Sequence, residues 1–323
     1  MKAGLPVLVL LALGSLPARA AVTEIHYVMG SYLRITVDGM AEPAARAAMR
    51  RCFMRVQALD ARFSRFRPDS ELSQVNASAD GPSAVSGDMR ALLARALALR
   101  QATGGSFDPT IGRLTRLWRD AETWPSPAEW IAAQPPTGAA ALVLTSGGLE
   151  RRAGVQIDLD GIAKGWAVDD CTALLRAAGA GDALLNFGDS SWRVIGRARE
   201  IELRDSAGAY ALGTVRLHDE ALSVSSVYGH RHTIGGVPIG HIVDPHRGVA
   251  LRRAATAVTI APSATDAEAF SKAVLVDRGL RDRRHLVTGA LLIDGGGIRR
   301  WRRVRWRGFA PPVRLPADAE PLQ

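Results

Sequence analysis

The sequence predicts an α+β protein built on a large, mostly antiparallel sheet with helices inserted between its strands. Two observations predict this class. Between residues 182 and 260, short apolar runs alternate with turn residues, a pattern typical of antiparallel strands. Longer stretches before, between and after these runs carry apolar residues at helical spacing. Since no internal repeat or linker-like segment divides the 323 residues, we expect a single domain.

The elements are expected in a regular order along the chain. An apolar stripe predicts a helix over 43–63. Ser86 is a suitable cap for a second helix over 89–101, which ends at a pair of glycines. Residues 120–138 hold four of the 17 prolines and predict an irregular surface segment. Two more helices are expected over 162–178 and 266–276, and strands over 23–29, 32–37, 140–145, 155–159, 183–187, 192–195, 201–203, 212–217, 222–224, 239–243, 255–260, 291–293 and 298–306.

The N-terminus is interpreted as a secretory signal peptide over residues 1–20. Lys2 gives a positive start, an apolar run follows over 5–13, and Ala18-Arg19-Ala20 fits a cleavage site. We therefore expect an exported, periplasmic protein whose folded domain spans 21–310, with a C-terminal tail over 311–323. No later stretch is apolar for long enough to predict a membrane span.

Composition excludes several classes of protein. With 47% apolar and 23% charged residues, the chain is typical of a globular protein. The formal charge of +9 does not by itself indicate nucleic-acid binding, because the 32 acidic residues are spread along the chain. Cys52 and Cys171 are too few for a multi-disulfide scaffold or a four-thiolate zinc site. In an oxidising compartment, one disulfide or two separately buried thiols would fit equally well.

Lysine is rare in this chain, and its positions are informative. Only three of the 41 Lys and Arg residues are lysines, and outside the expected signal peptide these are Lys164 and Lys272. Lys164 falls in the first turn of the helix over 162–178, where its charge opposes the helix dipole. This cost favours an anion site built from the lysine and the helix N-terminal amides. A surface ion pair with Asp158 or Asp160 explains the same residue equally well.

A loop that carries Ser106, Phe107 and Asp108 follows the glycine pair 104–105. Glycines and a phenylalanine are suited to placing a loop against a flat aromatic ligand. Asp108 is equally well explained as the cap of the helix that follows, with Pro109 at its first position. The loop alone is therefore a weak signal.

Two further segments carry groups suited to catalysis. His241 lies on an expected strand that brings Asp244 to a turn, and histidine is a natural general base near neutral pH. A lone strand histidine is nevertheless more often structural. Glu268 and Lys272 form an i,i+4 pair at the start of the helix over 266–276, which an ordinary salt-bridged helix would also explain.

Taken together and in this order, these segments resemble the ApbE family of FAD:protein FMN transferases. The resemblance is carried by Met29-Gly30-Ser31, residues 63–73 with Asn76, and residues 105–110, 158–169 and 241–248. It implies an ApbE-like domain that binds FAD and uses a divalent cation, usually Mg²⁺. It also implies transfer of the FMN half of FAD to a threonine hydroxyl on an exported or membrane-bound partner protein, with release of AMP.

The same resemblance implies the roles of individual residues. His241 is expected to take the threonine proton, with Asp244 orienting it. The backbone carbonyl of Gly161 and the carboxylate of Glu268 are expected to bind the metal. The resemblance implies FAD contacts from eight residues: Met29, Phe66, Ser106, Phe107, Asp108, Asp158, Lys164 and Ile242.

Three positions depart from the family pattern. Phe66 replaces a tyrosine, and the turn after Asn186 has one glycine where the family has two. The largest departure is Lys272, which the ungapped match puts in the place of a metal-binding threonine. A lysine ammonium only donates hydrogen bonds and cannot bind a cation. A shift of two residues would make Asp266 the ligand, but it would put Phe270 in the threonine position.

The departure at Lys272 leads to a hypothesis and two alternatives. The hypothesis is that Lys272 partly substitutes for the metal near the pyrophosphate, so that Mg²⁺ binds weakly or not at all. The alternatives are a flavin-binding protein and an FAD pyrophosphatase on the same scaffold. The arginine-rich segment 299–307 is interpreted as an edge strand rather than a phosphate or membrane surface. A serine hydrolase is not indicated, because no GxSxG motif is present.

Overall fold

The computed structural model describes residues 20–78, 81–136, 141–204, 211–277, 287–295, 301–308 and 313–314. The expected signal peptide, apart from Ala20, lies outside these residues. The helices are α1 (Glu42–Phe63), α2 (Glu71–Ala77), α3 (Gly87–Ala102), α4 (Gly112–Asp120), α5 (Pro127–Ala133), α6 (Ala163–Ala177) and α7 (Ala264–Asp277). The strands are β1 (Val22–Val28), β2 (Ser31–Asp38), β3 (Gly81–Ser83), β4 (Leu142–Thr145), β5 (Gly148–Arg151), β6 (Asp182–Phe187), β7 (Ser191–Ile195), β8 (Arg199–Arg204), β9 (Ala211–Leu217), β10 (Ala221–Ser226), β11 (Arg231–Ile234), β12 (Val237–Gly240), β13 (Val243–Asp244), β14 (Val249–Ala250), β15 (Ala255–Ala261), β16 (Gly289–Gly295), β17 (Trp301–Gly308) and β18 (Val313–Arg314).

The centre of the molecule is an eight-stranded sheet in the order β1-β2-β6-β7-β10-β15-β16-β17. Each neighbouring pair in this sheet is antiparallel, which confirms the predicted α+β class. β2 pairs directly with β6, so that helices α1 to α6 are inserted between two adjacent strands. The register of Leu33 opposite Phe187 brings the β1–β2 turn and the β6–β7 turn to the same end of the sheet.

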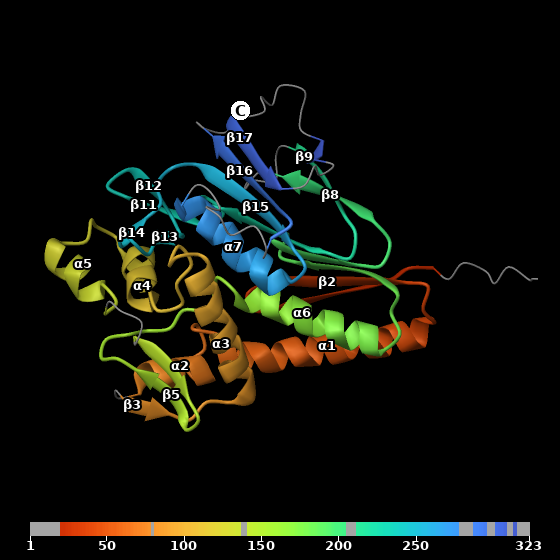
Figure 1. Ribbon diagram of the computed structural model, residues 1–323, viewed down its shortest axis with the longest axis horizontal. Helices are drawn as coiled ribbons and strands as arrows, with labels where there is room; N and C mark the ends of the chain where they lie inside the picture. The colour runs from red at the N-terminus through yellow and green to blue at the C-terminus, as the bar shows by residue number, and fades with distance from the viewer. Residues whose placement is uncertain are drawn as a thin grey trace, which may run out of the picture.

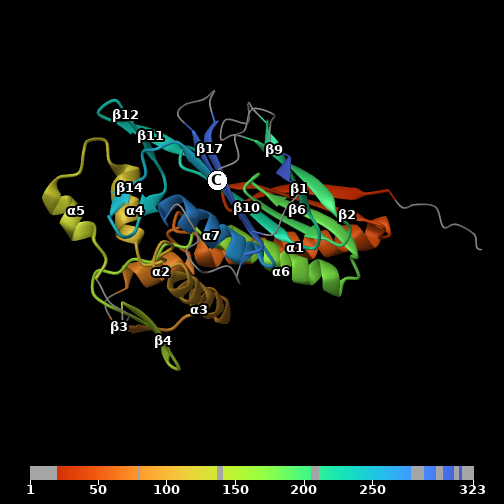
Figure 2. The same cartoon turned by 45° about the horizontal axis from the view of Figure 1, so that its top comes forward.

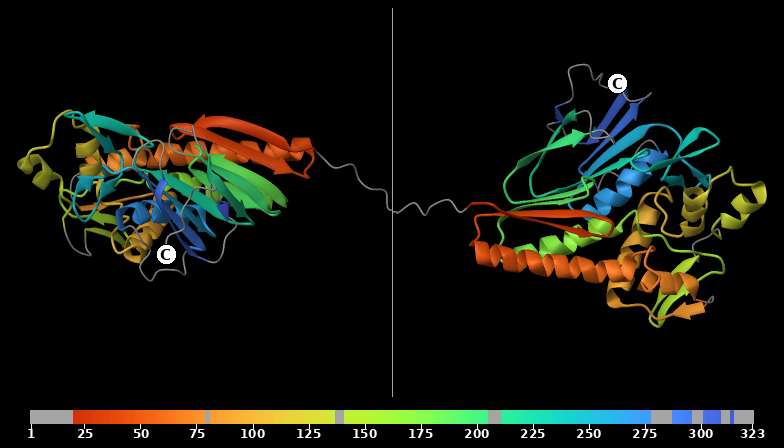
Figure 3. Two further views of the ribbon diagram at one scale, coloured as in Figure 1. Left: turned by 90° about the horizontal axis from the view of Figure 1, so that it is seen from above. Right: turned by 180° about the vertical axis from the view of Figure 1, so that it is seen from behind.

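Helices cover one face of the large sheet, and a smaller sheet covers part of the other. α1 packs on α6, α6 packs on α7, and α7 lies across β10 and β15, as Figure 1 shows. On β10 and β15, Leu222 and Val258 face the apolar cluster shared with β8 and β9. The alternate residues Ser223 and Thr259 hydrogen-bond to α7, as the period of two along a strand requires. The views in Figure 3 show β8 and β9 on the opposite side of the large sheet from α1.

A separate group of packed helices and hairpins supports the segment that contains His241. α4, α5 and the hairpins β11–β12 and β13–β14 gather at one end of the molecule, as Figure 2 shows. Ile111, which precedes α4, and Leu114 of α4 pack there against the hairpin strands. The indole N–H groups of Trp118 and Trp130 both donate to the carbonyl of Gly248, at 2.8 and 2.9 Å. The two helices are therefore fastened to the turn that closes the His241 segment.

The structure differs from the sequence prediction in two segments. Residues 120–138 contain the helix α5, where Ser126 and Glu129 form a capping box that the sequence analysis missed. The predicted strand over 155–159 is wrong, because within the described part of the chain its only strand-like pairing is one parallel bridge between Gln156 and Ile111. The side-chain amide of Asn76 donates to the Ile157 carbonyl and accepts from the Ile157 amide, both at 2.8 Å. A side chain therefore supplies the hydrogen bonds that a neighbouring strand would otherwise supply.

Several other expectations have definite outcomes. α1, α3, α6 and α7 match the four predicted helices, and Ser86 caps α3 by accepting a hydrogen bond from the Met89 amide. β17 is an edge strand of the large sheet, and β18, within the predicted tail, pairs with β9. Cys52 and Cys171 are both buried free thiols, and the Cys52 thiol faces the Cys171 carbonyl at 3.7 Å. Among the described residues, no helix is long and apolar enough to cross a membrane.

Candidate active site

The N-terminus of α6 brings Lys164 to the end of the large sheet. Its ammonium donates to the hydroxyl of Ser190, at 3.1 Å, in the turn between β6 and β7. The predicted surface pair with Asp158 or Asp160 therefore does not describe its hydrogen bond. The amide of Ala163 donates to a preceding carbonyl at 2.9 Å, and the amide of Gly165 donates to a carboxylate described below. Two N-terminal amides predicted to bind an anion are thus already paired, and the lysine charge remains.

The β1–β2 turn lies next to this lysine. Met29 and Gly30 both have left-handed backbones, with φ of 49° and 69°, as a two-residue hairpin turn requires. A methionine in this conformation is uncommon, and its side chain packs against the main core. Ser31 lies so close to Gly188 that a Cβ at Gly188 would be 2.3 Å from its Oγ. The structure therefore brings Met29 to the same end of the sheet as Lys164.

Glu268 and Lys272 form one side of the site, which we call the α7 wall. Glu268 is only 1% exposed. One of its carboxylate oxygens accepts from the Gly165 amide at 2.5 Å, and the other accepts from the Lys272 ammonium at 3.2 Å. Burial lowers the pKa of Lys272, against the opposing effect of Glu268. The i,i+4 ion pair that the sequence predicted is therefore present, in a buried position.

The position of Asp266 settles the register of α7. Its carboxylate accepts a hydrogen bond from the Arg95 guanidinium of α3 at 2.8 Å. Phe270, which the shifted register would place at a ligand position, is completely buried in the core. Asp169 of α6 accepts hydrogen bonds from the first amides of the helix, including that of Ala264 at 2.8 Å. α7 is thus held in the ungapped register, in which Glu268 and Lys272 face α6.

Arg65, Asp158 and Asp160 form a second side, which we call the Arg65 wall. The guanidinium of Arg65 contacts Asp158 at 2.8 Å and Asp160 at 2.7 Å. The Asp160 side chain is 40% accessible; partial desolvation and the neighbouring Asp158 raise the pKa of its carboxyl, and the charge of Arg65 opposes this shift. The ring of Phe66 is 67% exposed and lies 4.8 Å from the Arg65 guanidinium carbon and 5.6 Å from that of Arg119. The exposed ring is held in place by cations and is open to stacking.

The loop after α3 places Phe107 between the two walls. A Cβ at Gly161 would lie 3.1 Å from the Phe107 ring and 3.9 Å from Cε of Lys272. Asp108 accepts hydrogen bonds from the Thr110 amide at 2.9 Å and from Arg100 at 2.6 Å. The predicted helix cap is therefore wrong, because Asp108 closes a short turn and α4 begins only after Ile111.

The same loop touches the segment that follows His241. The hydroxyl of Ser106 lies 3.3 Å from Nε2 of His246, a residue that the sequence analysis did not single out. Asp244 accepts from the amides of His246 and Arg247 at 2.8 and 3.2 Å. Asp244 thus shapes this turn. The sequence Asp244-Pro245 directly before His246 was the signal that could have indicated the turn and drawn attention to His246.

His241 is oriented by a backbone carbonyl. Its Nδ1 lies 3.1 Å from the carbonyl oxygen of His230, and since a carbonyl only accepts, Nδ1 carries the proton and Nε2 is the basic nitrogen. This contact, rather than the expected one from Asp244, sets the tautomer. The ring keeps an exposed edge, but burial and His230, followed by Lys272 and Lys164, lower its pKa to about 4. The neighbouring Ile242 is buried in the main core, with 6% of its surface exposed.

The predicted metal ligands do not fit a divalent cation. Both oxygens of Glu268 already accept hydrogen bonds, and the Lys272 ammonium lies where a cation would have to approach. Within the described part of the chain, no group of three or more His, Cys, Asp and Glu side chains is arranged to hold a metal ion. The roles predicted for Gly161 and Glu268 as ligands therefore remain sequence predictions without structural support.

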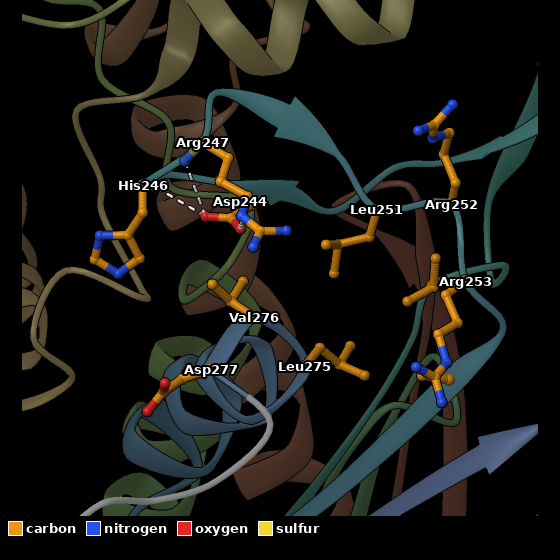
Figure 4. Close-up of a pocket in the computed structure, with 11 residues that line it drawn as sticks. Asp244, His246, Arg247, Leu251, Arg252, Arg253, Leu275, Val276 and Asp277 are labelled. Atoms are coloured by element: carbon orange, nitrogen blue, oxygen red, sulfur yellow. Dashed lines mark hydrogen bonds and ion pairs between the residues drawn. The ribbon is translucent and has the colours of Figure 1, made fainter.

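A cavity of ≈530 Å³ lies beside these groups, between the β13–β14 hairpin and the C-terminal end of α7. Figure 4 shows Asp244, His246 and Arg247 on one side of it and Leu275, Val276 and Asp277 below. Its lining also includes Arg252 and Arg253. Because Val276 follows Lys272 by one helical turn, it continues the face of α7 that carries the α7 wall. The cavity next to the site is thus lined by three arginines and two aspartates, with apolar side chains between them.

Comparison with known proteins gives a consistent result. The model of the ApbE family matches residues 29–289. A FAD:protein FMN transferase of Treponema pallidum is 30% identical over 307 residues, covering 85% of this chain and 84% of that protein. A FAD:protein FMN transferase of Klebsiella pneumoniae is 26% identical over 322 residues, covering 91% and 90%.

Solved structures have the same fold. The ApbE protein of Thermotoga maritima superposes with a TM-score of 0.77 at 26% identity, covering 86% of this chain and 96% of that one. The apo form of the flavinyl transferase ApbE of Pseudomonas stutzeri gives a TM-score of 0.77 at 24% identity, covering 88% and 94%. These likenesses confirm the predicted α+β fold with one large sheet.

Proposed function

The chain belongs to the ApbE family and is an FAD:protein FMN transferase, and we propose that it attaches FMN to a threonine of an exported partner and releases AMP. The observation that carries this proposal is the position of His241. Its basic Nε2 is set by the His230 carbonyl, and its ring lies within the electrostatic reach of Lys164 and Lys272. A base and two cations close together suit a reaction at a pyrophosphate. We call the group formed by the two walls, Lys164 and His241 the recess.

The reaction follows from these groups. Nε2 of His241 takes the proton of the threonine hydroxyl, whose oxygen forms a bond to the phosphorus of the FMN half. The bond from that phosphorus to the bridging oxygen breaks, and AMP leaves with the bridging oxygen and its electron pair. Because His241 is neutral at pH 7, it can accept a proton throughout the neutral range.

FAD binding is proposed to use Phe66, whose ring lies beside the Arg65 wall, and Lys164. The exposed ring of Phe66 offers a stacking surface, and the Lys164 ammonium, bonded only to a neutral hydroxyl among its described contacts, offers charge to a phosphate. The proposed reaction does not use Mg²⁺, because Glu268 and Lys272 do not fit the divalent cation that the family resemblance implies.

The test is a transfer assay with a candidate acceptor domain. The purified chain, FAD and the acceptor are incubated with and without Mg²⁺, and mass spectrometry is used to look for covalently attached FMN while AMP is measured. Replacing the acceptor threonine with alanine should abolish attachment. AMP without labelled acceptor would indicate an FAD pyrophosphatase instead, and neither product would indicate a flavin-binding protein.

His241→Ala should reduce transfer by about 10²- to 10⁴-fold, the range expected for a lost general base. His218→Ala is the matched control, because His218 is exposed at the end of β9 and away from the recess. Equal losses in the two variants would contradict the role of His241.

Export is part of the proposal and has its own test. The N-terminal pattern supports cleavage before Ala21. Cell fractionation followed by N-terminal sequencing should recover a periplasmic protein that begins at Ala21. Recovery of the uncleaved chain in the cytoplasm would contradict it.

A further inference from the structure

The space between Gly161 and Glu268 is occupied by the Lys272 side chain. By family resemblance these two residues would flank a metal ion. Cε of Lys272 lies 3.9 Å from the position of a Cβ on Gly161, and its ammonium lies 3.2 Å from Glu268. The lysine therefore spans the interval between the two expected ligands. A dication placed there would meet a positive charge at contact distance.

The packing of α7 fixes the position of Lys272 along the helix axis. The hydroxyl of Ser271 lies 2.6 Å from that of Ser225 on β10, which fixes the adjacent residue against the sheet. Gly165 allows the close approach of α6, since a Cβ there would lie 2.5 Å from the Ala264 carbonyl oxygen. The helix is thus fixed on two sides, and neither contact would survive a shift along its axis.

The charges of the recess suit a pyrophosphate without a metal. FAD carries two negative charges on its pyrophosphate, and the recess holds the two ammonium groups of Lys164 and Lys272. Glu268 orients the second of these by accepting one of its three N–H groups. The two lysines outside the expected signal peptide are therefore both at this site, and every other Lys or Arg position outside that peptide is an arginine.

We propose that the Lys272 ammonium takes the place of the divalent cation and stabilises the negative charge on the FAD pyrophosphate, so that binding and transfer are metal-independent. The proposal rests on the proposed transferase function. It assigns Glu268 the role of a positioning residue that holds the ammonium in place of its expected role as a metal ligand.

The test measures FAD affinity by the quenching of flavin or tryptophan fluorescence, with excess EDTA and with Mg²⁺. The wild-type dissociation constant should be the same in both. In Lys272→Thr, which introduces a hydroxyl ligand and removes the ammonium, FAD should bind about tenfold more weakly in EDTA and recover with Mg²⁺. Calorimetry with MgCl₂ should detect binding to the FAD-loaded variant and none to the FAD-loaded wild type.

Lys164→Thr is the matched control. It also removes a lysine and should weaken FAD binding, but it should not create a response to Mg²⁺. Circular dichroism and the thermal midpoint establish that each variant is folded, and Lys272→Met provides a second variant that keeps the length of the side chain. A wild-type protein whose FAD affinity rises with Mg²⁺ as much as that of Lys272→Thr would overturn the proposal.

The outcomes separate this inference from the proposed function. Transfer by the wild type only when Mg²⁺ is present would contradict the role of Lys272 and leave the transferase function intact. FAD binding that is independent of Mg²⁺, with no AMP and no labelled acceptor, would contradict the transferase function. The proposal that Lys272 takes the place of the metal in FAD binding would then still hold.

Discussion

The two walls of the recess use different cations for different purposes. On the Arg65 wall, one guanidinium bridges two carboxylates, at 2.8 and 2.7 Å, through separate nitrogens. On the α7 wall, a single ammonium contacts one carboxylate at 3.2 Å. A planar guanidinium is suited to holding fixed partners, whereas an ammonium on a flexible stem can follow a moving charge. The comparison indicates that the Arg65 wall mainly holds structure and the α7 wall mainly acts on the substrate.

The largest effect is expected when the α7 wall is disrupted by replacing Lys272. Lys272→Met should slow FMN transfer by about 10²- to 10³-fold, because it removes a charge directed at the transition state. The double variant Glu268→Gln/Lys272→Met should be equally slow but recover thermal stability, since no buried carboxylate is left unpaired. Transfer rates and melting temperatures of both variants check this. A rate close to that of the wild type in either variant would show that the α7 wall does not act on the substrate.

The second effect is expected when the Arg65 wall is disrupted by replacing Arg65. Arg65→Ala should reduce the free energy of unfolding by about 3 kcal/mol, because Asp158 would keep a nearly buried charge without its main partner. Denaturant titration gives this value. Arg67→Ala is the control, since its pair with Asp69 is exposed and should contribute less than about 0.5 kcal/mol. Equal stability of the two variants would contradict the structural role of Arg65.

The third effect is the dependence of kcat/KM on pH, which His241 is expected to control. Burial, His230 and the lysine charges lower the pKa of His241 to about 4. Since the base must be neutral, kcat/KM should be constant between about pH 5 and 6 and fall tenfold per unit as the pH drops below about 4. Lys272→Met should move this acidic limb to higher pH by a fraction of a unit, because one nearby positive charge is removed. An acidic limb near pH 6.5 in the wild type would contradict the arrangement.

The smallest effect concerns the second lysine. Ser190→Ala should raise the dissociation constant of FAD about fivefold, because the Lys164 ammonium loses the hydroxyl that holds it at 3.1 Å. Equilibrium binding measured by flavin fluorescence checks this. Ser78→Ala is a control at the residue that follows α2, where the described contacts of the hydroxyl are with Val75, Ser83 and Arg151, and it should leave FAD affinity unchanged.

The order of elements was largely predictable, while some local features were not. The alternation of apolar and turn residues between 182 and 260 predicted the antiparallel strands, because a side-chain period of two is a local property. The failure at 155–159 has a specific cause. Asn76, 81 positions earlier in the chain, supplies the hydrogen bonds of Ile157 that a strand neighbour would have supplied.

The sequence by itself determined the family, the order of its motifs and the unusual lysine at position 272. These are properties of residue identity and spacing. Only the tertiary structure decided which acids face the recess, because Asp266 and Glu268 are two residues apart and point to different partners. It also decided which nitrogen of His241 is basic, since the His230 carbonyl that sets it faces His241 across the open end of the β11–β12 hairpin. The first decision depends on contacts between segments far apart in the sequence, and the second depends on how the two strands of one hairpin pair, neither of which residue spacing encodes.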